Sequence, residues 1–286
     1  MDGDRSFIAA AVTLRTGRDL KANVDHVVPL VERAIAEGAR YVQTPEMTSL
    51  IERDKASLMA QIGTEEDDAV VAALRDVARR RQVAVHVGSV AVKTGDKLAN
   101  RALLIGPDGA IAARYDKIHL FDVDLPSGQS WRESRTYAGG QEAVLVEMPW
   151  GLLGLSICYD VRFPYLYRAL ASAGAEVLSA PACFTKETGE AHWSILLRAR
   201  AIENGAFMIA AAQGGTHEDG RVTYGHSMIV DPWGRVLAEG SEEPGVIVAT
   251  IDPSVVAAVR GRIPSLQHTR QFRLGYARLA AAQAAE

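Results

Sequence analysis

The sequence is poor in cysteine, with only Cys158 and Cys183 among 286 residues, and it has no long apolar run. The two cysteines could pair, but no export signal is evident, which favours a reducing compartment and a cytoplasmic location. The first residues, Met1–Arg5, lack the basic start and apolar core of a signal peptide, and no segment is long enough to cross a bilayer. We therefore expect no membrane partner.

The chain also lacks an excess of positive charge, since its formal net charge is -4 and no cluster of lysine and arginine stands out. A nucleic-acid partner is therefore not expected. The seven histidines are scattered without metal-ligand spacing, so we predict no metal and no cofactor. A composition of 48% hydrophobic and 23% charged residues is typical of a soluble globular protein with a sizeable core.

Apolar runs typical of strands alternate with helix-like segments, and no linker or repeat divides the chain. We predict one domain over residues 1–286, with a core at about 6–252 and a tail at 264–286 that lies at a subunit interface or is partly disordered. The expected fold is an α/β domain with one mixed sheet, or two packed sheets, covered by helices. The predicted strands lie at 6–12, 41–43, 83–88, 100–105, 110–115, 142–148, 151–157, 176–180, 207–212, 226–230, 235–237 and 246–251.

Helices are predicted from caps and spacing. Asn23 is expected to cap a helix that Gly38 ends, and Thr64 precedes an acidic turn and a helix that runs to Arg81. The charges at both ends of that second helix suit its dipole and are expected to lie in solvent without a further role. Two more helices are expected, after Pro164 and over residues 191–204, whereas residues 121–141 are predicted to form a long polar loop.

Three residues share one setting, because Glu46, Lys117 and Cys158 each close an apolar strand and precede turn-like sequence. If these strand ends converge, a carboxylate, an ammonium group and a thiol meet in one crevice. The thiolate would be a nucleophile favoured by the nearby cation, the carboxylate could take its proton, and the ammonium group could stabilise an oxyanion. The alternatives are a packed cysteine, a surface glutamate and a solvated lysine.

Three stretches of the sequence strengthen the catalytic interpretation: Pro45-Glu46, Tyr115-Asp-Lys-Ile-His-Leu-Phe-Asp-Val-Asp124 and Ile157-Cys-Tyr-Asp-Val-Arg-Phe-Pro164. In this order they resemble the signature motifs of the nitrilase superfamily, the carbon–nitrogen hydrolases. The similarity runs from about residue 7 to residue 271. It implies a four-layer α-β-β-α sandwich of nitrilase type with two mixed sheets, assembled as a homodimer or a higher homo-oligomer.

The resemblance also implies roles for individual residues. Glu46 would be the general base, Lys117 the stabiliser of the oxyanion and Cys158 the nucleophile that forms a thioester. The backbone N–H of Tyr159 would be the second oxyanion donor, and Glu133 would position the lysine and the substrate. Cys183 is expected to be a small packed residue near the site.

Further motifs, at Thr188–Trp193, Arg198–Glu203 and Tyr224–Gly234, resemble the Nit-type amidases. That branch implies hydrolysis of a small carboxylate-bearing primary amide to acid and ammonia, with deaminated glutathione as the expected substrate. An omega-amidase acting on α-ketoglutaramate, an N-carbamoyl or nitrile hydrolase, and a catalytically silent partner-binding scaffold remain alternatives. His192 is expected to fix a loop or touch a subunit rather than bind metal.

A substrate carboxylate calls for a cation, and we assign Arg162 to it because a guanidinium group pairs with a carboxylate in a bidentate way. A structural ion pair with Asp160 or another acid is the alternative for Arg162. Phe184, Thr185 and Tyr224 match family positions near the substrate pocket.

Overall fold

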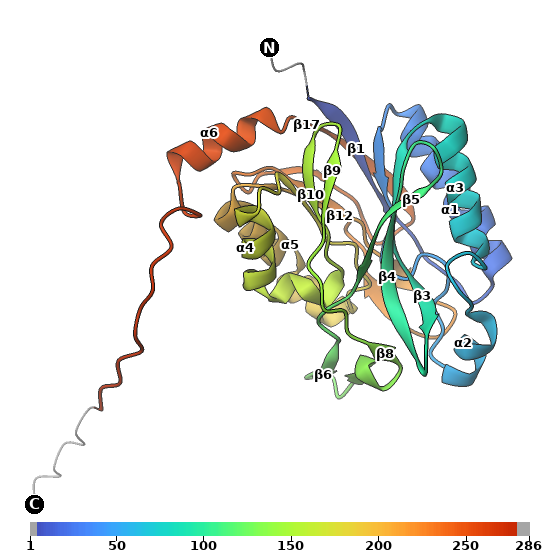
Figure 1. Cartoon of the computed structure of the whole chain (residues 1–286). Helices are drawn as coiled ribbons and strands as arrows, with labels where there is room; N and C mark the ends of the chain where they lie inside the picture. The colour runs from blue at the N-terminus through green and yellow to red at the C-terminus, as the bar shows by residue number, and fades with distance from the viewer. Residues whose placement is uncertain (1–4, 279–286) are drawn as a thin grey trace, which may run out of the picture.

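The computed structural model describes residues 5–278, and these form four layers, helices–sheet–sheet–helices (Figure 1). The first sheet has the order β17-β1-β2-β3-β4-β5, with β8 pairing β4. β1, β2 and β3 are parallel, and the outer pairs are antiparallel. Its strands are β1 Phe7–Thr13, β2 Tyr41–Gln43, β3 Ala84–Thr94, β4 Lys97–Ile105, β5 Ile111–Asp116, β8 Tyr137–Ala138 and β17 Gly245–Ile251.

The second sheet repeats the plan of the first, in the order β16-β15-β12-β11-β10-β9. The parallel strands are again the three inner ones, β10, β11 and β12, flanked by antiparallel neighbours. Its strands are β9 Leu145–Met148, β10 Gly151–Gly154, β11 Val177–Ser179, β12 Phe207–Ala210, β15 Met228–Val230 and β16 Val236–Glu239. Two small hairpins complete the strands: β6 Asp122–Asp124 with β7 Ser130–Arg132, and β13 Gly214–Thr216 with β14 Val222–Tyr224.

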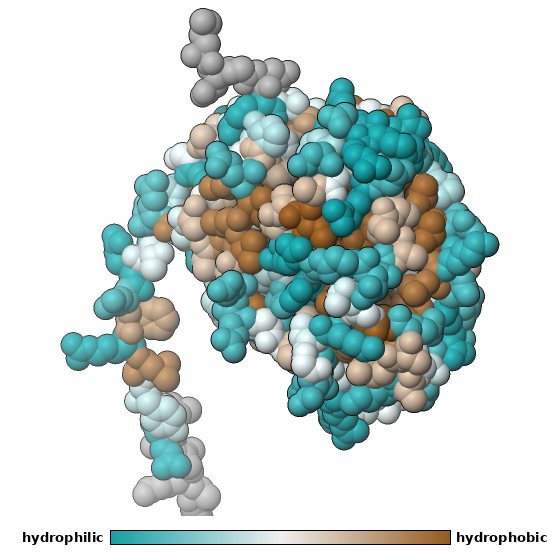
Figure 2. All heavy atoms as spheres, turned by 45° about the vertical axis from the view of Figure 1, so that its right-hand side comes forward, coloured by the Kyte–Doolittle hydropathy of each residue, from teal (hydrophilic) through white to brown (hydrophobic). Residues whose placement is uncertain are grey.

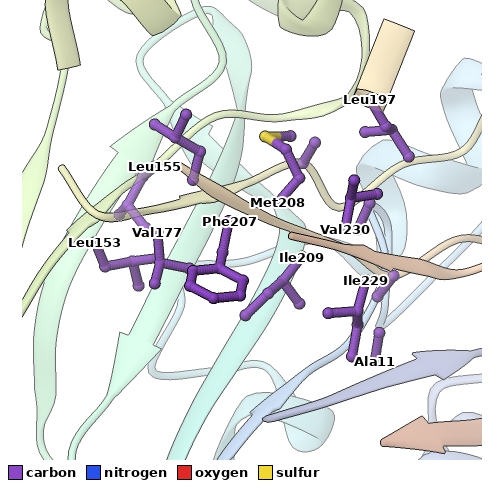
Figure 3. Packing of buried hydrophobic residues seen from close by; sticks show 14 of the residues in the cluster. Ala11, Leu153, Leu155, Val177, Leu197, Phe207, Met208, Ile209, Ile229 and Val230 are labelled. Carbon is purple, nitrogen blue, oxygen red and sulfur yellow. The ribbon is translucent and has the colours of Figure 1, made fainter. Parts of the chain in front are cut away.

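The sheets pack face to face because their strands are apolar on both sides. In β1, Ala9 and Ala11 join the core between the sheets, whereas Ala10 and Val12 face the first helical layer. Figure 3 shows the same alternation in the second sheet, where Ile209 lies on the side of Ala11 and Met208 on the side of helix α5. Strands buried on both faces form continuous apolar runs, which is why these segments were recognisable in the sequence.

Helices α1 and α3 cover the first sheet, and α4 and α5 cover the second (Figure 1). The four-layer sandwich of nitrilase type is thus confirmed, with two mixed sheets. The helices are α1 Leu20–Ala36, α2 Lys55–Gln61, α3 Ala69–Arg81, α4 Pro164–Ser172, α5 Lys186–Asn204 and α6 Ser254–Arg262.

The residues that cap α1 and α3 differ from the prediction. Asp19, rather than Asn23, caps α1, and its side chain accepts from the backbone N–H of Ala22. Asn23 is buried one turn into the helix and donates to the carbonyls of Gly17 and Ser49 instead. Asp68 caps α3, so the expected first turn at 65–68 lies before the helix. A polar side chain near a helix start predicts the helix but not which residue caps it.

The acidic segment before α3 is also less solvated than expected. Glu65 is 5% exposed and forms ion pairs with Arg101 and Arg114, on β4 and β5. Its carboxylate therefore ties this segment to the first sheet, and the expectation of a solvated glutamate without a role was wrong. The short helix α2 had no predicted counterpart, and α5 begins at Lys186, five residues before the predicted start.

After α6 the chain leaves the body of the protein (Figure 1). Up to Arg278 it has no further helix or strand, and Phe272, Leu274 and Tyr276 are about 90% exposed. Figure 2 shows apolar side chains on this tail, clear of the body. The remainder of the predicted tail, 279–286, lies outside the described residues. Within residues 5–278 no helix is long and apolar enough to cross a membrane.

Gly88 in β3 lies where three segments of the chain approach one another so closely that no side chain fits. A Cβ there would lie 2.1 Å from the Thr44 carbonyl oxygen and 2.5 Å from Cβ of Pro181. We predict that Gly88→Ala lowers the free energy of unfolding by about 1–3 kcal/mol, since overpacking displaces backbone.

Urea unfolding of wild type, Gly88→Ala and Gly261→Ala tests this prediction. A Cβ added at Gly261 in α6 would meet no atom within 4 Å, so its replacement should raise stability by up to about 1 kcal/mol. An unchanged midpoint for Gly88→Ala would contradict the account of this contact.

Candidate active site

Cys158 lies four residues after the end of β10 and begins a short 3₁₀ helix, Cys158–Arg162. Its backbone has φ of 50°, which is uncommon for a residue other than glycine. The Cys158 N–H donates to the carbonyl of Pro181 at 2.9 Å, and the residue is 7% exposed. This bond ties the strained turn to the end of the neighbouring strand, β11, and holds the thiol in place.

Asp160 connects the cysteine segment to the lysine segment. Its fully buried carboxylate accepts from the Ile157 N–H at 2.9 Å and from the Tyr115 hydroxyl at 2.6 Å. The other oxygen accepts from the His119 N–H at 3.0 Å and faces Nδ1 of the same ring at 2.7 Å. Asp160 had no predicted role in the site, although an aspartate two residues after Cys158 is placed to cap the start of the 3₁₀ helix by accepting from the Ile157 N–H.

Glu46 lies in the loop after β2 and is 4% exposed. Its Oε1 accepts from Nζ of Lys117 and from Nδ2 of Asn100, both at 2.8 Å. Its Oε2 accepts from the Cys183 N–H at 2.8 Å. Gln213 fixes the backbone here, because Nε2 donates to the Glu46 carbonyl at 3.1 Å. Asn100 and Gln213 were both missed as site residues: Asn100 begins a predicted strand, and Gln213 ends an Ala-Ala-Gln stretch that was given no role in the site.

Lys117 follows β5 and is held between two carboxylates. Its Nζ lies 2.8 Å from Glu46 Oε1 and 2.9 Å from Glu133 Oε2. Glu133 also accepts from the Phe121 N–H at 2.7 Å and from Asn100 Nδ2 at 3.0 Å. Hydrogen bonds to two carboxylates from different segments thus fix the ammonium group, which is 2% exposed.

The protonation states follow from burial and from these neighbours. Burial opposes ionisation of Glu46, but the charge of Lys117 and hydrogen bonds from Cys158, Lys117 and Asn100 outweigh it and lower the pKa of Glu46. Burial likewise opposes the charge of Lys117, yet Glu133 and Glu46 raise its pKa well above the usual value. The resting site therefore holds a carboxylate and an ammonium ion.

The protonation state of the Cys158 thiol differs from the expected thiolate. Burial, and next the negative charge of Glu46, raise the pKa of Cys158 well above that of a free cysteine, and Lys117 offsets this only in part. The resting sulfur is therefore a neutral thiol, hydrogen-bonded to the Glu46 carboxylate, and not a thiolate favoured by the cation. A neutral thiol next to an ionised carboxylate is an arrangement for base-assisted attack.

Glu46, Lys117 and Cys158 open together into a cavity of about 510 Å³. Glu133, Tyr159, Cys183, Phe184 and Thr185 also line it, so most of the predicted site residues lie in one place. Among residues 5–278, no group of three or more histidine, cysteine, aspartate or glutamate side chains could hold a metal ion.

Two predicted substrate residues lie outside the cavity lining. Arg162 stacks near Phe184 and Tyr159, 5.4 Å and 5.9 Å from the ring centroids, and its Nη1 lies 3.3 Å from His192 Nδ1. The alternative ion pair with Asp160 does not form, because Asp160 faces His119. Tyr224 stacks on His226 at 4.3 Å.

A four-layer sandwich with glutamate, lysine and cysteine converging at the ends of its strands is the arrangement that the resemblance to the carbon–nitrogen hydrolases implies. The family model described as "Carbon-nitrogen hydrolase" matches residues 8–261. The chain therefore belongs to the carbon–nitrogen hydrolase family and is an enzyme of its amidase class.

Two curated relatives are similar to most of this chain. The chain is 43% identical over 272 residues to the deaminated glutathione amidase of Synechocystis, covering 92% of this chain and 98% of the relative. It is 37% identical over 269 residues to the human deaminated glutathione amidase, covering 92% and 82%.

Solved structures agree with the fold. The Caenorhabditis elegans NitFhit protein matches with a TM-score of 0.86 and 38% identity, over 94% of this chain and 66% of that longer chain. A variant of the amidase from Nesterenkonia sp. AN1, with a TM-score of 0.77 and 28% identity, covers 94% of this chain and 95% of its own. That structure carries the acetamide moiety of fluoroacetamide on the active-site cysteine.

The origin of the thiol pKa can be tested by removing the carboxylate. In Glu46→Gln the nearby negative charge is lost and the charge of Lys117 remains, so the pKa of Cys158 should fall. Thiolate absorbance followed against pH, with Cys183→Ser as background in both proteins, measures it. A thiol that titrates at the same or a higher pH in Glu46→Gln would contradict this electrostatic account.

Proposed function

We propose that the protein hydrolyses an amide through a thioester on Cys158, with Glu46 as general base and Lys117 as oxyanion stabiliser. The observation that carries this proposal is the convergence of the buried Cys158 thiol, the Glu46 carboxylate and the Lys117 ammonium group on one cavity, with Glu46 and Lys117 2.8 Å apart. The adduct on the active-site cysteine of the Nesterenkonia amidase supports the role of Cys158 as nucleophile.

In the first half of the reaction, Glu46 takes the thiol proton as sulfur attacks the amide carbon. Lys117 Nζ and the Tyr159 N–H would donate to the oxyanion; Tyr159 is the second residue of its 3₁₀ helix, where an N–H has no partner within the helix. Glu46 then gives its proton to the leaving nitrogen, and a thioester remains. Glu133 keeps Lys117 charged and oriented, since it too bonds Nζ.

In the second half, the ionised Glu46 takes a proton from water, which attacks the thioester. The carbon–sulfur bond then breaks, Glu46 returns the proton to the Cys158 sulfur, and the acid is released. Each step is easier than direct attack of water on the amide. Because Oε2 of Glu46 is held by the Cys183 N–H and Oε1 by Lys117 and Asn100, the carboxylate keeps one position through both halves.

For the substrate we propose deaminated glutathione, the compound named for the most similar curated relatives. The expected release of ammonia from a primary amide does not apply to this substrate. A primary amide releases ammonia, whereas the 2-oxoglutaryl group of deaminated glutathione is joined to cysteinylglycine by a secondary amide. Its leaving group is therefore the amine of cysteinylglycine, and ammonia release would report α-ketoglutaramate alone.

The two candidate substrates share the 2-oxoglutaryl group and differ only in what leaves. An omega-amidase activity on α-ketoglutaramate is accordingly the second candidate. A cavity of about 510 Å³ has room for more than this small primary amide, which favours the larger substrate.

We further propose that the catalytic domain is single, with its core at 6–252, that it is cytoplasmic, and that it works as a homodimer or higher homo-oligomer. The exposed apolar side chains of Phe272, Leu274 and Tyr276 support a tail that packs on a partner subunit, because three large apolar side chains exposed within five residues form a group, and exposed apolar groups mark protein–protein contacts.

The proposal predicts which products appear. Deaminated glutathione should give cysteinylglycine and 2-oxoglutarate without ammonia, and α-ketoglutaramate should give ammonia at a lower kcat/KM. Chromatography and an ammonia assay on the same samples measure both.

Cys158→Ala is the control for this measurement and should lower kcat at least about 1,000-fold while the unfolding midpoint stays near that of wild type. Cys183→Ser should keep most of the activity. Turnover of either compound that survives Cys158→Ala would overturn the mechanism, and failure of both compounds with wild type would overturn the substrate assignment alone.

A further inference from the structure

The wall of the cavity beyond the reacting residues carries two arginines around one tryptophan. The guanidinium carbon of Arg53 lies 4.9 Å from the centroid of the Trp131 ring, and that of Arg221 lies 5.3 Å from the same ring. All three residues line the cavity that contains Cys158. They come from three separate segments of the chain: the loop before α2, β7, and the turn between β13 and β14.

Arg221 is held in place but is incompletely bonded. Its side chain is 16% exposed, and one guanidinium nitrogen lies 3.2 Å from Asp219 Oδ2. Its Nε is buried without a hydrogen-bond partner among the described residues, and so is Nε1 of Trp131. Buried donors without partners are costly, so two in one wall point to a ligand that supplies acceptors.

The cations of this wall differ in what they contact. Arg132 donates to both carboxylate oxygens of Asp124, at 2.8 Å and 2.9 Å. Lys55 donates to the Arg135 carbonyl at 3.3 Å. Arg53 is exposed, and it forms no ion pair within residues 5–278. Arg221 pairs with Asp219 but keeps its Nε without a partner among the described residues, so Arg53 and Arg221 both retain donors for a ligand.

One residue connects this pair to the reacting groups. The Cys183 N–H donates to Glu46, and Cys183 Sγ lies 4.0 Å from Arg221 Nη1. Cys183 therefore contacts both Arg221 and Glu46, the carboxylate that activates Cys158. A group bound there would belong to the part of the substrate that stays near the thiol.

We propose that Arg221 and Arg53, with Trp131 as the platform between them, bind a carboxylate on the acyl part of the substrate. This rests on the proposed function and assigns the residues that bind the carboxylate of the 2-oxoglutaryl group. A guanidinium group stacked on an aromatic ring keeps its edge free for bidentate bonding to a carboxylate. Arg162, the residue chosen from the sequence, lies outside the lining and is engaged with His192.

The test uses two amides of equal length. Glutaramate ends in a carboxylate where pentanamide ends in a methyl group, and both release ammonia. Arg221→Gln should lower kcat/KM for glutaramate about 30-fold or more, mainly through KM, and change that for pentanamide less than about threefold. Arg53→Gln should act in the same direction with a smaller factor, because Arg53 is more exposed.

Arg132→Gln is the matched control, since it removes an arginine from the same wall whose guanidinium is bonded to Asp124. It should change the two kcat/KM values by the same small factor. Equal losses for both amides in Arg221→Gln would show that Arg221 only supports Cys183 and Glu46. No change for either amide would likewise overturn the proposal.

A binding measurement distinguishes a failure of the carboxylate site from a failure of the proposed catalytic function. In Cys158→Ala, calorimetry with glutaramate should show affinity that falls about 30-fold on adding Arg221→Gln, whether or not wild type turns the compound over. Equal affinity in the two proteins would refute the carboxylate site while leaving the thioester mechanism untouched. If Arg221→Gln does not fold, the same comparison with Arg53→Gln decides, because Arg53 is exposed.

Discussion

The site depends on one buried ammonium group, Lys117, placed between the carboxylates of Glu46 and Glu133. A buried charge without a partner would be costly, and the two carboxylates keep Lys117 charged. Burial and the negative charge of Glu46 raise the pKa of the Cys158 thiol, so it stays protonated at rest. The thiol proton then has one obvious acceptor, Glu46, and this carboxylate sets the direction of the first proton transfer.

The sandwich brings these groups together because the strand ends of both sheets meet on one side. Glu46 and Lys117 follow strands of the first sheet, and Cys158 follows a strand of the second. Asp160 fastens the turn of Cys158 to the segment of Lys117, so the two sheets cannot shift without breaking buried hydrogen bonds. Packing of the apolar strand faces therefore holds the Cys158 thiol in a fixed position relative to Glu46 and Lys117.

Much of this could be predicted from the sequence, because strands buried on both faces are continuous apolar runs and reacting residues close them. Glu46, Lys117 and Cys158 were found in this way, with the family resemblance. Asn100 and Gln213 could not be found, since a polar residue inside or after a strand looks the same whether it bonds a catalytic loop or only the core. The arginines of the cavity wall could not be identified for a related reason: Arg53 and Arg221 come from segments far apart in the sequence, and only the fold shows that they line the cavity while Arg162 does not.

Mass spectrometry of the trapped intermediate tests the central claim most directly. Acid quenching during turnover of deaminated glutathione, followed by peptide mapping, should find the 2-oxoglutaryl group on Cys158, and α-ketoglutaramate should leave the same mass on the same residue. Turnover without any adduct on Cys158, or an adduct on Cys183 in its place, would contradict the mechanism derived from this site.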